Sequence, residues 1–391
     1  MAAQFQLTAR RVSTPPGVSP ANLGESPSWD DEHGVLWWID ILGQALYVGK
    51  VSTGCVSDFD RVAVLPLEGH RVGFVVHAGT PAENGGVDRG KAHFHAIWGS
   101  QSGLYYTSFS ADLPWCSVGG PSDVPQLTSA ADAPRHCLAE FPMKVFPLQD
   151  GRIYRFNDGK VGPDGSLWTG GMMERSAQHP KRDPGCGVLM QWTPGALENF
   201  TVGASGVTVS NGMGWSPAGN VLYHVDSPTA EIRAYPYYKP APGSPSGRTG
   251  HILQNEGYVF WSLPEDRKSR GATLDGLCVD SSGAVWVALS GIGEVVRLQA
   301  RKQSDPALPP LVTITGVVTL PGVTLCTSCC FGGVGLTTLY ITTARGTDPA
   351  AVAKCTQEGA GFVYAVNLKG IAKGMPPSRL HLPTSLTLPP L

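Results

Sequence analysis

The chain has 391 residues, of which 42% are hydrophobic and 15% charged, a composition typical of a globular rather than a disordered protein. Its formal net charge is −2 and it has no extended basic run, so neither nucleic acid nor a membrane surface is expected as a partner. The 49 glycines and 33 prolines indicate a fold with many tight turns.

The expected location is the cytoplasm. The first residues, MAAQFQLTARRVS, lack the apolar region of a secretory signal. The nine cysteines are an odd number without a framework spacing, which favours a reducing compartment. Cys326, Cys329 and Cys330 have no second Cys or His pair nearby, so we interpret them as packing residues rather than a zinc site. We therefore expect a soluble, cytoplasmic protein.

One plan recurs along the chain, first in GESPSWDDEHGVLWWID at residues 24–40. A large apolar residue follows each repeat opening by four positions, and then come a turn rich in Gly, Asp or Ser and an apolar strand. The openings are Glu25, Asn157, Asn211, Asp275 and Thr327, and the apolar residues are Trp29, Val161, Trp215, Val279 and Phe331. Repeats of about 40–50 residues, each built from short strands, are typical of propeller blades.

The first two openings, Glu25 and Asn157, are separated by about twice the spacing of the other openings. A sixth repeat is therefore expected between them. Its best candidate begins near His70, where HRVGFVV places Phe74 four residues later, before a Gly-rich insertion near 78–92 interrupts it. We therefore predict an all-β fold, a single six-bladed β-propeller over residues 1–373 with a metal in its central channel.

The remaining segments fit around this ring. Residues 5–12, FQLTARRV, are expected to be extended and to help close it. Further insertions near 110–136 and 239–250 are interpreted as surface loops. The Pro-rich tail, 374–391, is expected to be disordered or loosely draped.

The repeat openings carry the chemistry. The first strand of each blade lines the channel, so residues at equivalent places form one ring around the axis. That ring contains Glu25, a residue near His70, Asn157, Asn211, Asp275 and Thr327. Converging carboxylates and carboxamides need a counter-charge, and their oxygens suit a divalent cation.

A purely structural interpretation stays open, because NDG, NG and DG are ordinary turn dipeptides. Asp40 and Asp226, at the ends of apolar strands, are interpreted as hydrogen-bond acceptors between blades and are left out of the site. His93 and His95, beside the first insertion, are interpreted as surface or packing histidines.

The motifs GESPSWDDEHGVLWWIDI, RFNDGKVGPDGSLWTGGM, SNGMGWSPAGNVLYHVDS and LDGLCVDSSGAVWVA resemble those of the gluconolactonase, regucalcin (senescence marker protein) and luciferin-regenerating-enzyme family. All four occur in the expected order and span much of the chain between Gly24 and Leu298. The resemblance implies a six-bladed propeller that binds one divalent metal, and many members hydrolyse sugar lactones.

The resemblance also implies roles for single residues. Glu25, Asn211 and Asp275 match the metal-binding positions, and Asp275 also matches the suspected general base. Arg155 and Asn157 match the pair that holds substrate oxygens, with Asp158 beside them. Where the family often has acidic residues for sugar hydroxyls, this chain has Glu174, and the neighbouring Arg175 changes the local charge.

The leading hypothesis is therefore a divalent-metal-dependent lactonase acting on a small-molecule sugar lactone, with Ca, Zn, Mg or Mn as the ion. One alternative is hydrolysis of other esters or phosphotriesters on the same scaffold. Another is a calcium-binding regulatory protein without turnover, although Arg155 argues against it because a simple metal binder has no need of that residue. An interaction propeller with an empty channel fits the acidic ring least well.

Overall fold

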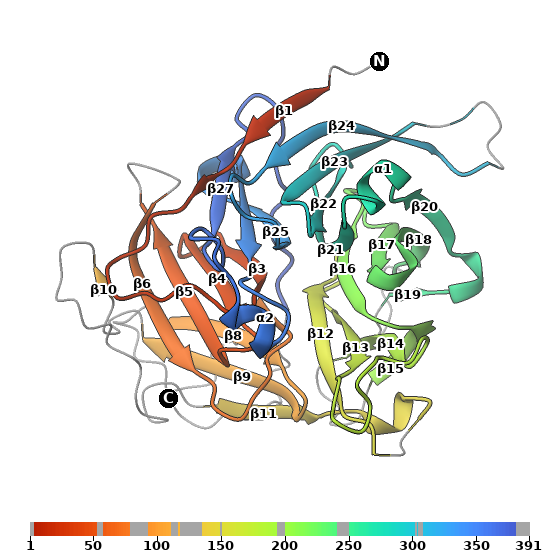
Figure 1. Cartoon of the computed structure of the whole chain (residues 1–391). Helices are drawn as coiled ribbons and strands as arrows, with labels where there is room; N and C mark the ends of the chain where they lie inside the picture. The colour runs from red at the N-terminus through yellow and green to blue at the C-terminus, as the bar shows by residue number, and fades with distance from the viewer. Residues whose placement is uncertain are drawn as a thin grey trace.

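The computed structural model describes residues 4–52, 58–78, 93–110, 116–117, 135–148, 151–193, 200–240, 250–301, 303 and 308–380. Six antiparallel sheets are arranged around a common axis (Figure 1). The innermost strands contact one another in the closed order β3, β7, β12, β16, β21, β25 and back to β3. The predicted six-bladed β-propeller is therefore confirmed.

Each blade is a meander that begins at the axis and runs outward. Blades one to three contain β3 (Gly24–Asp30), β4 (Val35–Asp40), β5 (Ala45–Val51) and β6 (Phe59–Pro66); β7 (Phe74–His77), β8 (His93–Gly99), β9 (Gly103–Ser110) and β11 (Arg135–Glu140); and β12 (Tyr154–Val161), β13 (Leu167–Met173), β14 (Gly187–Trp192) and β15 (Phe200–Val207). A short strand, β10 (Cys116–Ser117), extends blade one at β6.

Blades four to six follow the same order. They contain β16 (Ser210–Trp215), β17 (Val221–Asp226), β18 (Glu231–Tyr238), β19 (His251–Ile252) and β20 (Tyr258–Ser262); β21 (Thr273–Val279), β22 (Val285–Ser290), β23 (Glu294–Arg301) and β24 (Leu311–Thr319); and β25 (Cys326–Gly332), β26 (Thr338–Thr343) and β27 (Tyr364–Asn367). The α-helices of the described residues are short, α1 (Glu265–Lys268) and α2 (Pro349–Ala353).

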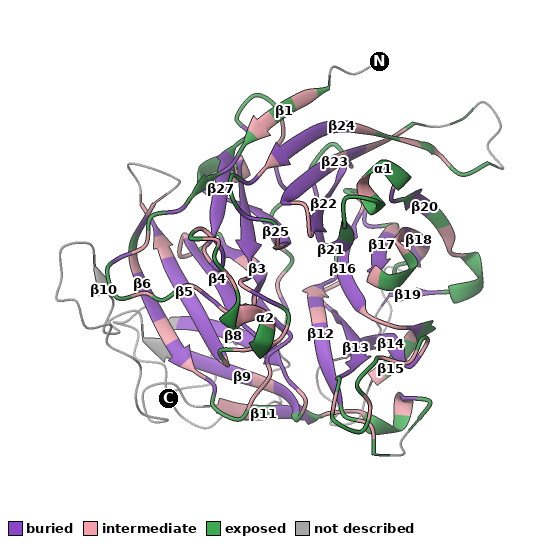
Figure 2. Cartoon of the chain, viewed as in Figure 1, coloured by how far each residue is buried: buried purple, intermediate pink, exposed green. Residues whose placement is uncertain are grey.

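The second strand of every blade buries an aromatic residue at the same position. These residues are Trp37, Trp98, Trp168, Tyr223, Trp286 and Tyr340. They stand in the apolar clusters between neighbouring sheets, and the strands near the axis are mostly buried (Figure 2). Burial of one large ring per blade contributes about 2–3 kcal/mol each, which explains why this position is aromatic throughout.

The N-terminal segment closes the ring, as predicted. β2 (Arg10–Arg11) pairs antiparallel with β27 and completes the sixth sheet. β1 (Phe5–Thr8) pairs in parallel with β24 at the outer edge of the fifth sheet. The segment therefore spans two blades.

The tail departs from expectation. Residues 374–380 are packed against the ring rather than loosely draped: Gly374 forms an isolated bridge with Asp280, and Leu380 forms one with Ala78. Leu380 is fully buried among apolar residues of blades two and three. This apolar anchor explains why a Pro-rich segment is held in place. Residues 381–391 lie outside the described part.

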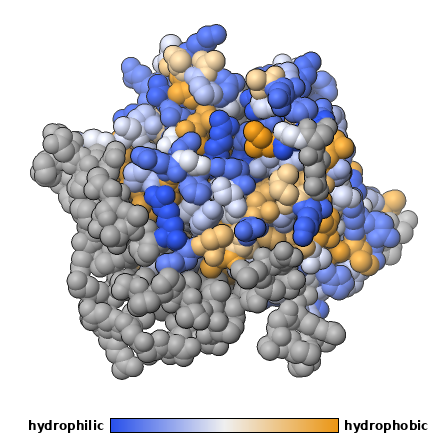
Figure 3. Space-filling view, turned by 90° about the horizontal axis from the view of Figure 1, so that it is seen from below, coloured by the Kyte–Doolittle hydropathy of each residue, from blue (hydrophilic) through white to orange (hydrophobic). Residues whose placement is uncertain are grey.

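The insertions near 78–92 and 239–250, and most of 110–136, also lie outside the described residues. Beyond them, no described helix is long and apolar enough to cross a membrane. The face seen in Figure 3 mixes hydrophilic and hydrophobic residues. The seven cysteines whose side chains are described are free thiols, and Cys326, Cys329 and Cys330 are buried, as packing residues should be.

Candidate functional site

Irregularities in the innermost strands place the polar side chains at the hub. Five of the six inner strands lose register with their neighbours at the repeat opening. Asn157, Asn211, Asp275 and Thr327 lie inside these shifts, and Glu25 lies at the edge of its own. An extra residue at a β-bulge redirects a side chain, so the bulges turn these residues away from the ordinary alternation of the strand.

Glycines beside the site allow the inner strands to approach closely. A Cβ on Gly212 would lie 2.4 Å from the backbone nitrogen of Leu277, and one on Gly73 would lie 2.1 Å from the carbonyl oxygen of Phe156. A Cβ on Gly276 would lie 2.0 Å from Ser328 Oγ. The NG and DG pairs therefore belong to tightly packed strands, and the interpretation of them as turn dipeptides is wrong.

Three carboxylates from three blades share one electrostatic environment. Burial and the nearby charge of Asp158 raise the pKa of Glu25 to about 8, against the lowering effects of the Ser26 N–H and Arg155. Burial together with the charges of Glu25 and Asp158 raises the pKa of Asp275 well above its usual range. Burial also raises the pKa of Asp158, opposed by Lys160. The site is thus deficient in positive charge.

A chain of hydrogen bonds links the predicted substrate residues to a predicted metal ligand. The guanidinium of Arg155 donates from Nε to Glu174 and from Nη1 to Asn157 Oδ1, at 2.6 Å for the latter. Asn157 Nδ2 donates to Asn211 Oδ1 at 2.9 Å, and Asn211 Nδ2 donates to Ser227 Oγ at 2.7 Å. Both carboxamides therefore have a fixed orientation.

Glu174 has a second partner that sequence reasoning missed. Arg71, just before β7, reaches Glu174 Oε2 with Nη1 at 3.4 Å. Burial would raise the pKa of Glu174, but the charges of Arg155, Arg71 and Arg182 hold it below its usual value. Only the basic residue beside the second repeat opening could have suggested this contact. Arg175, which follows Glu174, instead approaches Asp348 at 3.6 Å.

Thr327 and His70, at two other repeat openings, do not join the hydrogen-bond network of Arg155, Asn157 and Asn211. Thr327 Oγ1 hydrogen-bonds to the carbonyl of Gly24 and to Thr342 Oγ1, tying blade six to blade one. His70 precedes β7, and its Nδ1 lies 3.1 Å from Ser100 Oγ, so His70 itself stands outside this network.

Asp40 and Asp226 act as strand-end acceptors, as predicted, but they do so within their own blades rather than between blades. Asp40 accepts from the backbone of Asn22 and Leu23, and Asp226 accepts from Thr208 and Val209. Each carboxylate thus holds the chain that leads into its inner strand.

Beyond the polar ring, the channel becomes apolar. A cavity of about 490 Å³ is lined by the large residues four positions after the openings and is bordered by the tail. The lining includes Trp29, Val161, Trp215, Val279, Phe331 and Met375. The lining also contains Lys160 and His77, so this half of the channel is mainly apolar and carries two basic side chains.

The sequence matches the SMP-30/Gluconolactonase/LRE-like region over residues 23–345. The chain belongs to this family.

Within the SMP-30/gluconolactonase family, human regucalcin is 32% identical over 235 residues, which cover 57% of this chain and 66% of that protein. The solved structure of regucalcin from Agrobacterium tumefaciens, described as a calcium-binding protein, superposes with a TM-score of 0.66 at 21% identity, covering 98% and 100% of the two chains. A luciferin-regenerating enzyme gives 0.63 at 19% identity, covering 94% and 97%. These structures share the fold.

Membership of the SMP-30/gluconolactonase family explains why the repeat openings recur in register along the chain. Residues 23–345 include all four motifs and every predicted site residue. The alignment with human regucalcin covers slightly less than two thirds of that protein, so its activity is not carried over by similarity alone.

Proposed function

We propose that the protein is a divalent-metal-dependent hydrolase of cyclic esters, with a sugar lactone as substrate. The observation that carries the proposal is the convergence of Glu25 and Asp275, 250 positions apart in the chain, on one buried electrostatic environment. Family membership supports the reaction class.

The donor set fits a hard divalent cation. Glu25 and Asp275 provide carboxylate oxygens and Asn211 provides an amide oxygen, whose orientation is fixed from both sides by Asn157 and Ser227. The excess of buried negative charge, seen in the raised pKa values of Glu25 and Asp275, is what a cation would neutralise. When bound, such an ion polarises a substrate carbonyl and makes bound water more acidic.

The protein groups have separate tasks. Asp275 accepts a proton from the attacking water at a carboxylate oxygen. Arg155 uses Nε and Nη1 for described protein partners, which leaves Nη2 to donate to a substrate oxygen. Asp158, half-buried beside Glu25, accepts hydrogen bonds from substrate hydroxyls in this proposal. Glu174 keeps Arg155 in position through their ion pair.

The test is an assay of the chelated full-length chain on glucono-1,5-lactone, aryl esters and a phosphotriester, with Ca, Zn, Mg or Mn added back. We expect metal-dependent opening of the lactone, lost about 10²–10⁴-fold in Asp275→Asn. The matched control, Asp266→Asn, removes an exposed carboxylate on α1 and should keep full activity. Full turnover by Asp275→Asn would refute the assignment, and activity restricted to the other esters would replace the lactone.

A second candidate is a calcium-binding protein without turnover. Its support is the calcium-binding description of the Agrobacterium relative and the regucalcin name of several relatives. It predicts calorimetric binding of Ca²⁺ that requires Asp275, with no hydrolysis of any lactone under any metal.

A further inference from the structure

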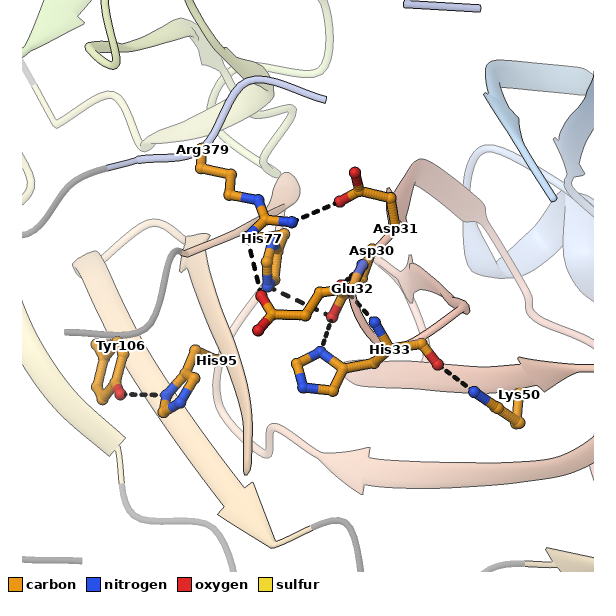
Figure 4. Close-up of polar contacts among 9 residues, drawn as sticks. All are labelled: Asp30, Asp31, Glu32, His33, Lys50, His77, His95, Tyr106 and Arg379. Atoms are coloured by element: carbon orange, nitrogen blue, oxygen red, sulfur yellow. Dashed lines mark hydrogen bonds and ion pairs between the residues drawn. The ribbon is translucent and has the colours of Figure 1, made fainter. Parts of the chain in front are cut away.

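A second group of possible metal ligands lies at the other end of β3. Asp30 ends this strand, His33 lies in the turn that follows, and His77 ends β7 of the next blade. One ligand atom from each lies within 4.8 Å of the others. Figure 4 shows the two imidazole rings approaching the Asp30 carboxylate from different sides.

The contacts converge on a single oxygen. His33 Nδ1 lies 2.6 Å from Asp30 Oδ2, and His77 Nε2 lies 3.4 Å from the same atom. The other oxygen, Oδ1, accepts from the backbone N–H groups of Glu32 and His33 at 3.0 and 3.1 Å. The turn therefore fixes the carboxylate so that Oδ2 faces both rings, as carboxylates around metal sites are held by further hydrogen bonds.

The fifth blade shows what a purely structural aspartate looks like at this place. Asp280 directly follows β21, the inner strand of the fifth blade, and is fully buried. Its Oδ1 also accepts hydrogen bonds from backbone N–H groups of the turn. Its Oδ2, however, accepts from Trp286 Nε1 and Arg297 Nε, both at 3.0 Å. Those donors cannot bind a metal. Blade one instead presents two imidazole nitrogens, which can.

His77 is nearly inaccessible to solvent: it is 3% exposed, and its Nε2 faces the Asp30 carboxylate inside the protein. The neighbouring carboxylates of Asp31 and Glu32 are not available for the group, because Arg379 pairs with both, at 2.7 and 2.9 Å.

We propose that Asp30, His33 and His77 form a second metal site, for Zn²⁺ or a similar transition ion. Two nitrogens and one carboxylate oxygen suit such ions better than calcium. Tetrahedral zinc places its ligand atoms about 3.3 Å apart, so the His77–Asp30 spacing already fits and the His33–Asp30 contact opens by about 0.7 Å.

This site is separate from the proposed lactonase centre. Glu25 and Asp30 are five residues apart on one strand, which is roughly 16 Å in extended chain. The bound ion joins blade one to blade two beside the tail, where Leu380 pairs with Ala78 next to His77. Its three protein ligands therefore link blade one to blade two.

The experiment uses the full-length chain, chelated and then titrated with Zn²⁺ alone in an Asp275→Asn background that disables the channel site. We expect one equivalent of Zn²⁺ bound, lost on adding either His33→Gln or His77→Gln and kept on adding His251→Gln, an exposed histidine. Absence of binding in the background, or binding unchanged by both histidine substitutions, overturns the proposal.

A second readout needs no histidine variant. Co²⁺ added to the Asp275→Asn chain should give the visible absorption bands of a tetrahedral ion with imidazole ligands, and addition of Zn²⁺ should remove them. A spectrum identical to that of hexahydrated Co²⁺ contradicts the site, even if the histidine variants fail to fold.

Discussion

Asn157 Nδ2 donates a 2.9 Å hydrogen bond to Asn211 Oδ1, joining the inner strands of blades three and four at the hub. The two residues are 54 positions apart in the chain, one repeat interval. The bond orients the carboxamide that we assign to the metal.

Asn157→Ala should weaken divalent-metal binding by about tenfold, because Asn211 loses one of the two bonds that hold its carboxamide. Calorimetric titration of the chelated protein measures the change. Asn367→Ala, which removes an exposed asparagine, serves as the control. Equal affinities for the wild type and Asn157→Ala would show that Ser227 alone suffices.

Glu174→Ala should lower the free energy of unfolding by about 3 kcal/mol, because it leaves the buried Arg155 guanidinium without its carboxylate. Denaturant unfolding followed by circular dichroism measures the loss. Glu256→Ala, which removes an exposed carboxylate, should change stability far less. A loss below about 0.5 kcal/mol for Glu174→Ala would mean that Arg155 is held by its other contacts.

Gly212→Ala should destabilise the protein by about 1–3 kcal/mol, since the new methyl group meets the backbone of β21, which cannot move aside as a side chain can. Gly271→Ala is the comparison, because its Cβ would meet open space and only its φ of 90° opposes the change. The midpoints of thermal unfolding should rank Gly212→Ala below Gly271→Ala. The reverse ranking would contradict tight packing at the hub.

The contribution of His224 to stability should fall as the solution is acidified below about pH 6.5. Burial and the charge of Arg233 lower the pKa of His224 to about 3, and its Nε2 lies 2.7 Å from Ser210 Oγ. The unfolded chain takes up a proton near pH 6.5 and the folded chain does so only near pH 3, so lowering the pH favours unfolding in between.

At pH 5 this difference amounts to about 2 kcal/mol. His224→Gln should therefore lose less stability than the wild type between pH 7 and pH 5, whereas His251→Gln should follow the wild type. Denaturant titrations at both pH values provide the comparison. Parallel slopes for all three proteins would remove His224 from the acid response.

Leu380→Ala should lower the free energy of unfolding by about 2–5 kcal/mol, because this side chain is fully buried against blades two and three. Leu253→Ala, at a leucine that is 42% exposed, is the control. The midpoints of thermal unfolding of Leu380→Ala and Leu253→Ala, measured side by side, provide the comparison. Equal midpoints would mean that the tail does not contribute to the fold.

Much of the fold could be predicted because the sequence repeats. The aromatic residue of the second strand and the apolar residue after each opening recur in register, and burial requires both. The blade near His70 was the hardest to place, because β7 has only four residues and no register shift at its start. The N-terminal closure was predicted from the extended character of residues 5–12.

The candidate site was only partly predictable. Register alone indicated Glu25, Asn157, Asn211 and Asp275, but the contact between Arg71 and Glu174 joins positions 103 apart, and no local pattern pairs them. The Asp30, His33 and His77 group was missed for the same reason, since His77 comes from another blade. The local sequence pattern predicts where a residue lies along its strand. Contacts between residues of different blades depend instead on which strands become neighbours in the fold.

Described segments near both ends of the chain cross sheet boundaries: β1 and β2 pair with strands of the fifth and sixth sheets, and Leu380 forms a bridge to Ala78 of the second. The fifth and sixth sheets therefore cannot separate from each other without releasing β1 or β2. We expect the propeller to melt in a single cooperative step, and proteases to find few partly opened forms from which to begin digestion.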